Sequence, residues 1–131
     1  MEQLTEIFGE VIHKYTRVDA IRDGTLIDVS ETAKEAGFKI PVAVTQAVWA
    51  DCVAVPRGLE GMQDESGRLW DVLFMLHHAI KFKNEGGDAV FYALYVARDC
   101  NNGTGLTYLK ALIHPGDDHE PVITIMQPDE D

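Results

Sequence analysis

The densest group of potentially reactive side chains lies near the C-terminus, in the segment HPGDDHE. Imidazole and carboxylate groups this close together could bind a divalent cation or transfer protons. Asp, Pro and Gly also favour tight turns, so a hairpin turn without bound metal is the alternative, and we take it as the default. The metal ligands under the first interpretation are His114, Asp117, Asp118 and His119.

A second group of candidates lies near the N-terminus, in the segment VIHKYTRVDAIRDGTLID. This segment resembles the opening unit of ADP-ribosyltransferase-like folds, where a histidine or arginine precedes a helix and a glycine. The resemblance implies that His13 or Arg17 contacts a nicotinamide dinucleotide, with Glu120 as the catalytic acid. It also implies that Tyr92 or Tyr95 stacks on the nicotinamide ring. A small enzyme, either of this kind or metal-dependent, is therefore the alternative function.

The other histidines and the cysteines give weaker signals. His77 and His78 are adjacent, so on a helix they point about 100° apart and cannot bind one ion together. Cys52 and Cys100 match neither a disulfide framework nor a metal-ligand spacing. We therefore expect no cofactor.

Charge is the most unusual bulk property of the chain. Asp and Glu total 22 against 11 Lys and Arg, which gives a formal net charge of −11. Such a surface repels phosphate, so direct binding to nucleic acid or to an anionic membrane is not expected. The acid gathers after Lys110, the last basic residue. It either keeps the chain in solution or binds a basic partner through Asp117, Asp118 and Glu120.

Length and composition indicate one globular domain. The chain has 131 residues, of which 46% are hydrophobic and 25% charged. We expect residues 1–131 to form a single domain, with about 1–6 and 128–131 frayed. The longest apolar run, Val72 to Leu76, is far too short to cross a bilayer, and the start lacks the pattern of a signal peptide. A cytoplasmic location follows as an expectation.

The elements that must position the candidate residues begin with three short helices. Thr16 and Asp19 have the spacing of a reciprocal cap, and Gly24 provides the left-handed stop. Ser30 caps a second helix in the same way, and Pro41 fits the first turn of a third. Apolar residues four apart form one stripe along that third helix, namely Val44, Val48 and Cys52.

The second half combines one long helix with strands. Apolar residues recur at helical spacing over residues 68–83, which predicts a central core helix. The period then changes to that of strands over 89–98, 106–114 and 122–126, separated by turn sequences. The expected fold is therefore α+β. Its helical N-terminal half includes the long core helix, which packs on a C-terminal three-stranded antiparallel β-meander.

Several phrases of the chain together resemble an uncharacterised bacterial family, DUF6573. They are Y-T-R, D-V-S-E-T-A, the W-D of the long helix and the ending P-G-D-D…E-P-V-I-T-I. The resemblance spans most of the chain and implies an origin on plasmids, phages or other mobile elements. It transfers no functional residues, because the family carries no settled activity.

The leading functional hypothesis is a non-enzymatic accessory protein of a mobile element that binds another protein with a basic surface. One form of this hypothesis is an anti-defence protein that imitates nucleic acid and occupies a basic groove. A homodimer is also compatible with the sequence. The apolar residues favoured for a contact face are Trp49, Leu59, Met62 and Trp70.

Overall fold

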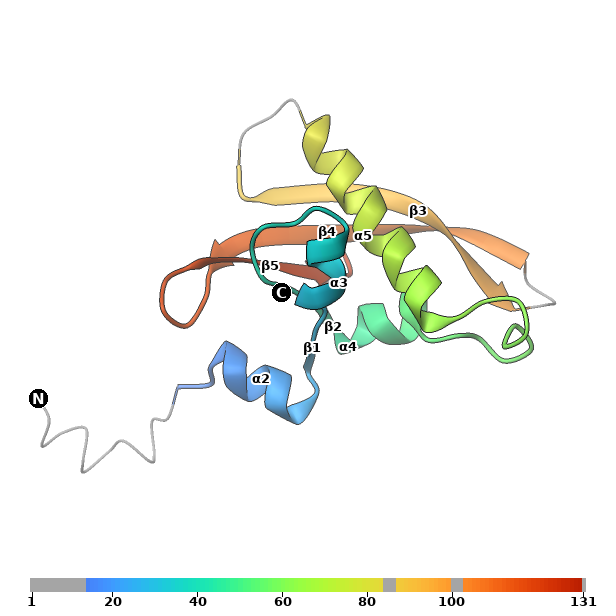
Figure 1. Cartoon of the computed structure of the whole chain (residues 1–131), viewed down its shortest axis with the longest axis horizontal. Helices are drawn as coiled ribbons and strands as arrows, with labels where there is room; N and C mark the ends of the chain where they lie inside the picture. The colour runs from blue at the N-terminus through green and yellow to red at the C-terminus, as the bar shows by residue number, and fades with distance from the viewer. Residues whose placement is uncertain (1–13, 84–86, 100–102, 131) are drawn as a thin grey trace, which may run out of the picture.

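The computed structural model describes residues 14–83, 87–99 and 103–130, and Figure 1 shows their arrangement. The helical elements are α2 (Arg17–Asp23), α3 (Ser30–Glu35), α4 (Gln46–Val48), the π-helical turn η1 (Trp49–Val53) and α5 (Glu65–Lys81). The strands are β1 (Leu26–Asp28), β2 (Val42–Thr45), β3 (Ala89–Asp99), β4 (Gly103–Pro115) and β5 (Pro121–Met126). No helix within these ranges is long and apolar enough to cross a membrane.

The five strands form one mixed sheet in the order β1-β2-β5-β4-β3. The strands β3, β4 and β5 are antiparallel to one another in chain order, which confirms the predicted meander and the α+β class. The antiparallel pair β1 and β2 extends this meander, because β2 pairs in parallel with β5. The strand β5 therefore lies at the centre of the sheet.

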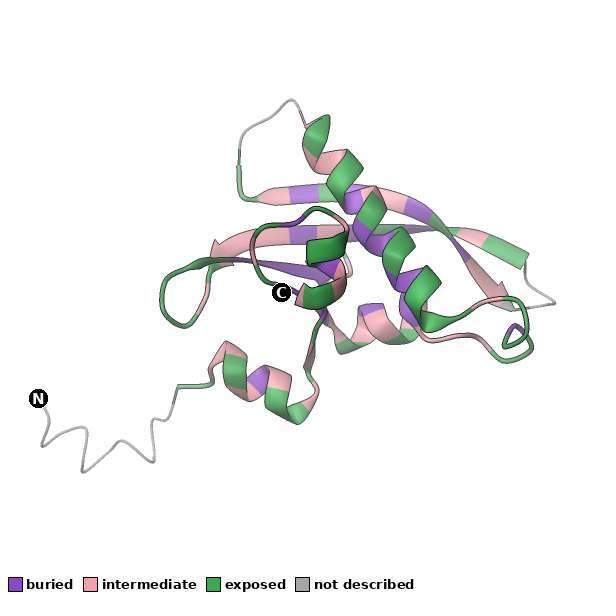
Figure 2. Ribbon diagram, viewed as in Figure 1, coloured by how far each residue is buried: buried purple, intermediate pink, exposed green. Residues whose placement is uncertain are grey.

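The long helix α5 covers one face of the sheet, with its closest packing on β3. Its buried positions lie on the side toward the sheet, as Figure 2 shows, and include the predicted core residues Leu69, Val72, Leu73 and Leu76. Alternate residues of β3 are buried beneath it, from Val90 to Val96. One of them, Tyr92, donates its hydroxyl hydrogen to the carbonyl oxygen of Val72 at 3.1 Å. This helix is therefore central, as its periodicity indicates.

The predicted start and stop of α2 are confirmed. The hydroxyl oxygen of Thr16 accepts a hydrogen bond from the backbone N–H of Asp19, and the Asp19 carboxylate accepts one from the backbone N–H of Thr16. Gly24 ends the helix with φ 88°, in the left-handed region. Signals within a few residues of each end therefore mark the start and the stop of this helix.

The predicted third helix is wrong over its first turn. Val42–Thr45 forms β2, and helix starts only at Gln46. The stripe of three residues is buried as predicted, but Val44 reaches the core from a strand, whereas Val48 and Cys52 reach it from the helical segment. The reason is that β1 and β5 flank this segment and satisfy its backbone groups, which favours its β-branched residues in extended form.

The residue Ser30 begins α3 but does not cap it as predicted. Val29 occupies the cap position and makes no side-chain hydrogen bond there. The Ser30 hydroxyl instead donates to the Asp28 carboxylate at 2.5 Å and accepts from the backbone N–H of Val42 at 3.1 Å. It therefore joins the start of α3 to β1 and β2.

Candidate functional site

The candidate residues of the C-terminal segment lie on the β4–β5 hairpin, which contacts the start of α2. The carboxylate of Asp117 accepts hydrogen bonds from the backbone N–H groups of Arg17 at 2.9 Å and Val18 at 3.0 Å. These N–H groups belong to the first turn of α2, where no carbonyl of the helix can reach them. Asp117 therefore caps a helix that lies 100 residues earlier in the chain.

Replacing Asp117 by alanine should lower the free energy of unfolding by about 1–2 kcal/mol, because two backbone donors lose their acceptor. Asp118→Ala is the matched control. It removes the same side chain from the next position, where the carboxylate is exposed and forms no hydrogen bond to any described residue. We expect it to change stability by less than about 0.5 kcal/mol. Urea unfolding followed by circular dichroism measures both, and equal losses would contradict the cap.

The guanidinium of Arg17 forms a second link between α2 and the sheet. It donates to the hydroxyl oxygen of Thr124 at 2.6 Å and to the carbonyl oxygen of Ile123 at 2.9 Å. The Nε2 atom of His114 lies 2.7 Å from the same hydroxyl, and its Nδ1 lies 3.0 Å from the carbonyl oxygen of Pro115. A carbonyl oxygen can only accept, so Nδ1 of His114 is the donor to Pro115.

Burial lowers the pKa of Arg17, and the nearby carboxylates of Asp28, Asp117 and Glu120 oppose that shift. The arginine therefore stays charged and joins the first helix to the central strand. Two predicted candidates from opposite ends of the chain, Arg17 and His114, do meet at Thr124. Both side chains contact the Thr124 hydroxyl, and this contact joins α2 to β4 and β5.

The remaining hairpin residues shape the turn. The Glu120 carboxylate accepts from the backbone N–H of Asp118 at 3.0 Å, and the Glu120 carbonyl oxygen accepts from the backbone N–H of Gly116 at 2.6 Å. His119 adopts φ 68°, a left-handed conformation that few non-glycine residues take. Within residues 14–83, 87–99 and 103–130, no group of three or more His, Cys, Asp or Glu side chains is placed to hold a metal ion.

The residues implied by the ADP-ribosyltransferase resemblance are dispersed. His13 lies outside the described residues. Tyr92 is buried under α5, and burial raises the pKa of its hydroxyl. Tyr95 points to the opposite face of the sheet, where 73% of it is exposed. Glu120 lies near Arg17, where its charge acts on the guanidinium.

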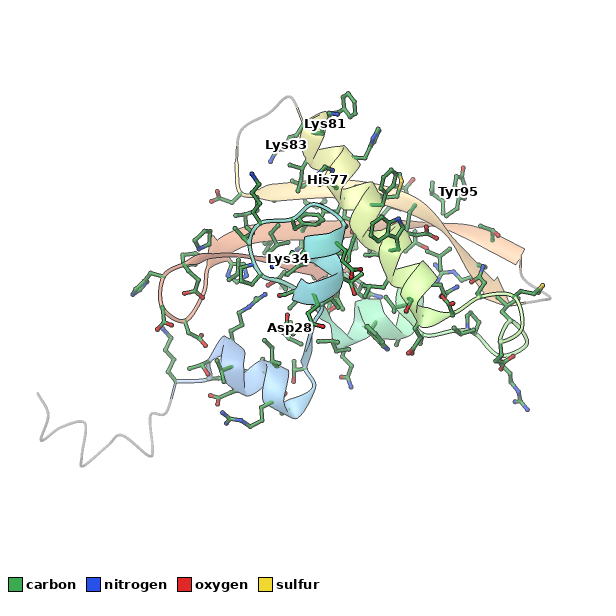
Figure 3. The ribbon with its side chains drawn as sticks, viewed as in Figure 1. Asp28, Lys34, His77, Lys81, Lys83 and Tyr95 are labelled. Atoms are coloured by element: carbon green, nitrogen blue, oxygen red, sulfur yellow. The ribbon has the colours of Figure 1, made fainter. Side chains whose placement is uncertain are left out.

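The register of the sheet gives the separation. Arg17 binds Thr124, which pairs with Leu112, which in turn pairs with Ala89. Tyr95 follows Ala89 by six residues on β3, which is roughly 20 Å along the strand. Figure 3 likewise shows Tyr95 well away from Asp28, a residue whose charge acts on Arg17. The described residues thus do not assemble a dinucleotide site around Arg17.

A different part of the molecule forms an acidic hollow. It has a volume of about 560 Å³ and lies between the loop before α5 and the first turns of that helix. Carboxylates line it together with exposed apolar side chains, and one buried arginine lies beneath them. Its lining includes Glu60, Met62, Asp64, Arg68, Trp70 and Asp71.

The three carboxylates of this acidic hollow keep free oxygen atoms. Asp64 caps α5 by accepting from the backbone N–H of Gly67 at 2.7 Å, and Glu60 accepts from the backbone N–H of Gly58 at 2.9 Å. Asp71 is exposed and forms no hydrogen bond or ion pair with any described residue. Each carboxylate has about four lone-pair sites, so all three can accept from a ligand.

The arginine at the base of the acidic hollow, Arg68, is only 6% exposed. Its Nε donates to the carbonyl oxygen of Val53 at 3.2 Å. Its Nη1 donates to the side-chain oxygen of Gln63 at 2.6 Å and to the carbonyl oxygen of Ala97 at 3.0 Å. Burial lowers its pKa. One side chain therefore fixes η1, the loop and the edge strand β3 relative to α5.

The cysteine beside Arg68 is not a nucleophile. Cys52 is 2% exposed, and burial raises the pKa of its thiol to about 11, so the thiolate is scarce at neutral pH. It fills the core, as its place on an apolar stripe predicts. Cys100 lies outside the described residues.

A second hollow, of about 570 Å³, lies beside α3 and has the opposite charge. Two lysines, Lys34 and Lys39, line it together with the apolar side chains of Phe38, Ile40 and Pro41. Figure 3 shows Lys34 on α3. None of the residues predicted as site residues lies in this hollow.

Comparison with known proteins gives one result. The model of the family of unknown function DUF6573 matches residues 4–131, nearly the whole chain. The chain belongs to DUF6573. No curated protein and no solved structure matches it. The DUF6573 assignment confirms the resemblance seen in the sequence phrases and adds no activity.

Sequence reasoning missed the acidic hollow of this DUF6573 chain, although two signals were present. Arg68 lies four residues before Val72 and eight before Leu76, so it shares their buried stripe. Met62 and Trp70, which were named as apolar candidates, are 74% and 40% exposed at the hollow, whereas Leu59 is buried. A charged residue on a buried stripe is the signal that would have identified this region.

Proposed function

We propose that this protein acts by binding another protein, and that the acidic hollow receives a basic segment of that partner. The observation that carries this proposal is the placement of three carboxylates around an exposed tryptophan. Three carboxylates face one guanidinium there, so the lining is negative even with Arg68 counted.

The chemistry of the hollow suits an arginine or lysine side chain. Asp71 accepts no hydrogen bond from any described residue, although its charge acts on Arg68, so its carboxylate can form a charge-assisted hydrogen bond without breaking an existing one. Trp70, 40% exposed, offers an indole surface for the same cation. A cation over an aromatic face contributes about 0.5–1 kcal/mol at an exposed site. The hydrogen bonds of Arg68 hold the surrounding backbone in place, which reduces the entropy lost on binding.

The charge of the whole chain supports the same proposal. A net charge of −11 attracts a basic partner over a distance and speeds its association. The hairpin residues Asp117, Asp118 and Glu120 are all exposed and contribute to this field, and the Asp117 carboxylate also accepts from the backbone of α2. If the partner is a nucleic-acid-binding protein, as the anti-defence hypothesis holds, its basic groove would supply the segment.

A labelled arginine- and lysine-rich peptide, titrated with the full chain and followed by fluorescence anisotropy, tests this function. The double substitution Glu60→Lys with Asp71→Lys should weaken binding by about tenfold or more, because it reverses the charge of the hollow. Glu31→Lys with Glu35→Lys is the matched control, since both residues are exposed on α3 and the change in net charge is identical. We expect the control to weaken binding by less than about threefold.

Salt gives an independent readout of the same titration. Binding of the unmodified chain should weaken as salt rises, because the attraction is screened. The proposal is overturned if the peptide does not bind at low salt, or if both double variants lose affinity equally. The second result would mean that net charge alone attracts the peptide.

A further inference from the structure

The face of the sheet opposite α5 carries a patch of exposed apolar side chains on β3 and β4. We name it the aromatic face and define it as Phe91, Tyr95, Leu106 and Tyr108. These residues are 67%, 73%, 46% and 62% exposed. Side chains alternate between the two faces of a strand, so each of them points away from α5, whereas their neighbours Tyr92 and Leu109 are buried beneath it.

The register of β3 and β4 makes this patch continuous. Tyr95 lies directly opposite Leu106, and Tyr108 lies opposite Ala93, the small residue between the two aromatic side chains of β3. Tyr108 is therefore the diagonal neighbour of both Phe91 and Tyr95, at a spacing that aromatic rings can bridge. The four side chains form one surface, and Figure 3 shows Tyr95 projecting from the ribbon there.

The same face of the sheet is covered elsewhere. Alternate residues of β5 point to it, and Val122, Thr124 and Met126 are 1%, 5% and 4% exposed. Arg17 at the start of α2 binds Thr124 from this side. The sheet is thus protected on both faces at its centre, and the face opposite α5 is open over β3 and β4.

The aromatic face carries no carboxylate, which is unusual in so acidic a chain. Among the residues of 89–97 and 104–112 that point to this side, Lys110 is the one charged side chain, and it donates to the carbonyl oxygen of Glu130 at 2.6 Å. A basic partner would gain no ion pair there. Two copies of this chain, in contrast, can join these faces without bringing carboxylates together.

We propose that the aromatic face is the interface of a two-fold homodimer in which the sheets of two copies pack face to face. The rings of Phe91, Tyr95 and Tyr108 expose on the order of 400 Å² per copy, at 150–250 Å² for a whole aromatic side chain. With Leu106 and the small residues between them, the pair buries roughly 1,000 Å². This is at the lower end of specific interfaces. We therefore expect a dissociation constant of the dimer in the micromolar range.

Sedimentation equilibrium of the full chain across the micromolar range tests the dimer. The unmodified chain should show a monomer–dimer equilibrium. Tyr108→Glu should weaken it by about a hundredfold or more, because it places a carboxylate of each copy in an apolar interface. The control is Phe74→Glu, at a residue that is 51% exposed on the outer side of α5, and it should leave the equilibrium unchanged.

Three outcomes would overturn the proposal. The first is a chain that sediments as a monomer throughout the concentration range. The second is a dimer that survives Tyr108→Glu, and the third is a dimer that Phe74→Glu disrupts equally. Salt separates this proposal from the proposed function. Screening should maintain or strengthen an apolar dimer of two acidic chains, whereas it weakens the binding of a basic peptide.

Discussion

Replacing Arg68 by methionine should lower the free energy of unfolding by about 3 kcal/mol, and replacing it by lysine should lower it by nearly as much. Methionine keeps most of the buried volume but removes every hydrogen bond that the guanidinium donates. The carbonyl oxygen of Val53 then loses its donor in a buried position, and that of Ala97 loses it in a half-buried one. Lysine keeps the charge but has one nitrogen, so it cannot reach three acceptors.

The control for this prediction is Arg22→Met. Arg22 also bonds a partner, the carboxylate of Asp19 at 3.2 Å, but its side chain is 73% exposed. An exposed pair of this kind contributes less than about 1 kcal/mol, so the substitution should scarcely change stability. Urea unfolding followed by tryptophan fluorescence measures both variants. A similar loss of stability in the two variants would show that the hydrogen bonds of Arg68 do not stabilise the fold more than an exposed ion pair does.

Replacing Leu76 by alanine should lower the free energy of unfolding by about 2–5 kcal/mol. Leu76 is 0% exposed and lies in the core cluster between α5 and the sheet. The loss combines the transfer of its methyl groups to water with the cavity that the neighbours cannot refill. Thermal unfolding should show a fall of several degrees or more in Tm.

Phe74→Ala is the matched control on the same helix. It removes a larger side chain than Leu76→Ala, but Phe74 is 51% exposed. We expect a change of less than about 1 kcal/mol. If the phenylalanine variant lost more stability than the leucine variant, the assignment of the two sides of α5 would be reversed.

The predictable part of the fold is the part that local sequence determines. The cap formed by Thr16 and Asp19, the long helix and the three C-terminal strands all have their signals within a few residues. The strand Val42–Thr45 has no such local signal. Its neighbours are β1 and β5, and its pairing with Ile123 and Thr124 joins residues about 80 positions apart. A proline before it also suits a helix start, so the local signal favoured the wrong element.

The candidate sites show the same division. The sequence singled out Arg17, His114 and Asp117, and these residues do come together around Thr124. Their side chains are of kinds that bind ligands or transfer protons. The structure shows that their hydrogen-bonding groups are already bonded to the backbone of α2 and to the sheet. The aromatic face could not be predicted, because aromatic residues alternate on both sides of β3. Which tyrosine lies inside depends on where α5 packs.

The central position of β5 has a consequence for synthesis. The ribosome makes the strands in chain order, so β1 with β2 and β3 with β4 emerge as two separate antiparallel pairs. Neither pair contacts the other within the sheet until Pro121–Met126 has left the ribosome and inserted between them. Until then, each pair presents an open edge to other chains in the cell. The last strand in chain order therefore completes the sheet, and the strand edges are most vulnerable to aggregation before that step.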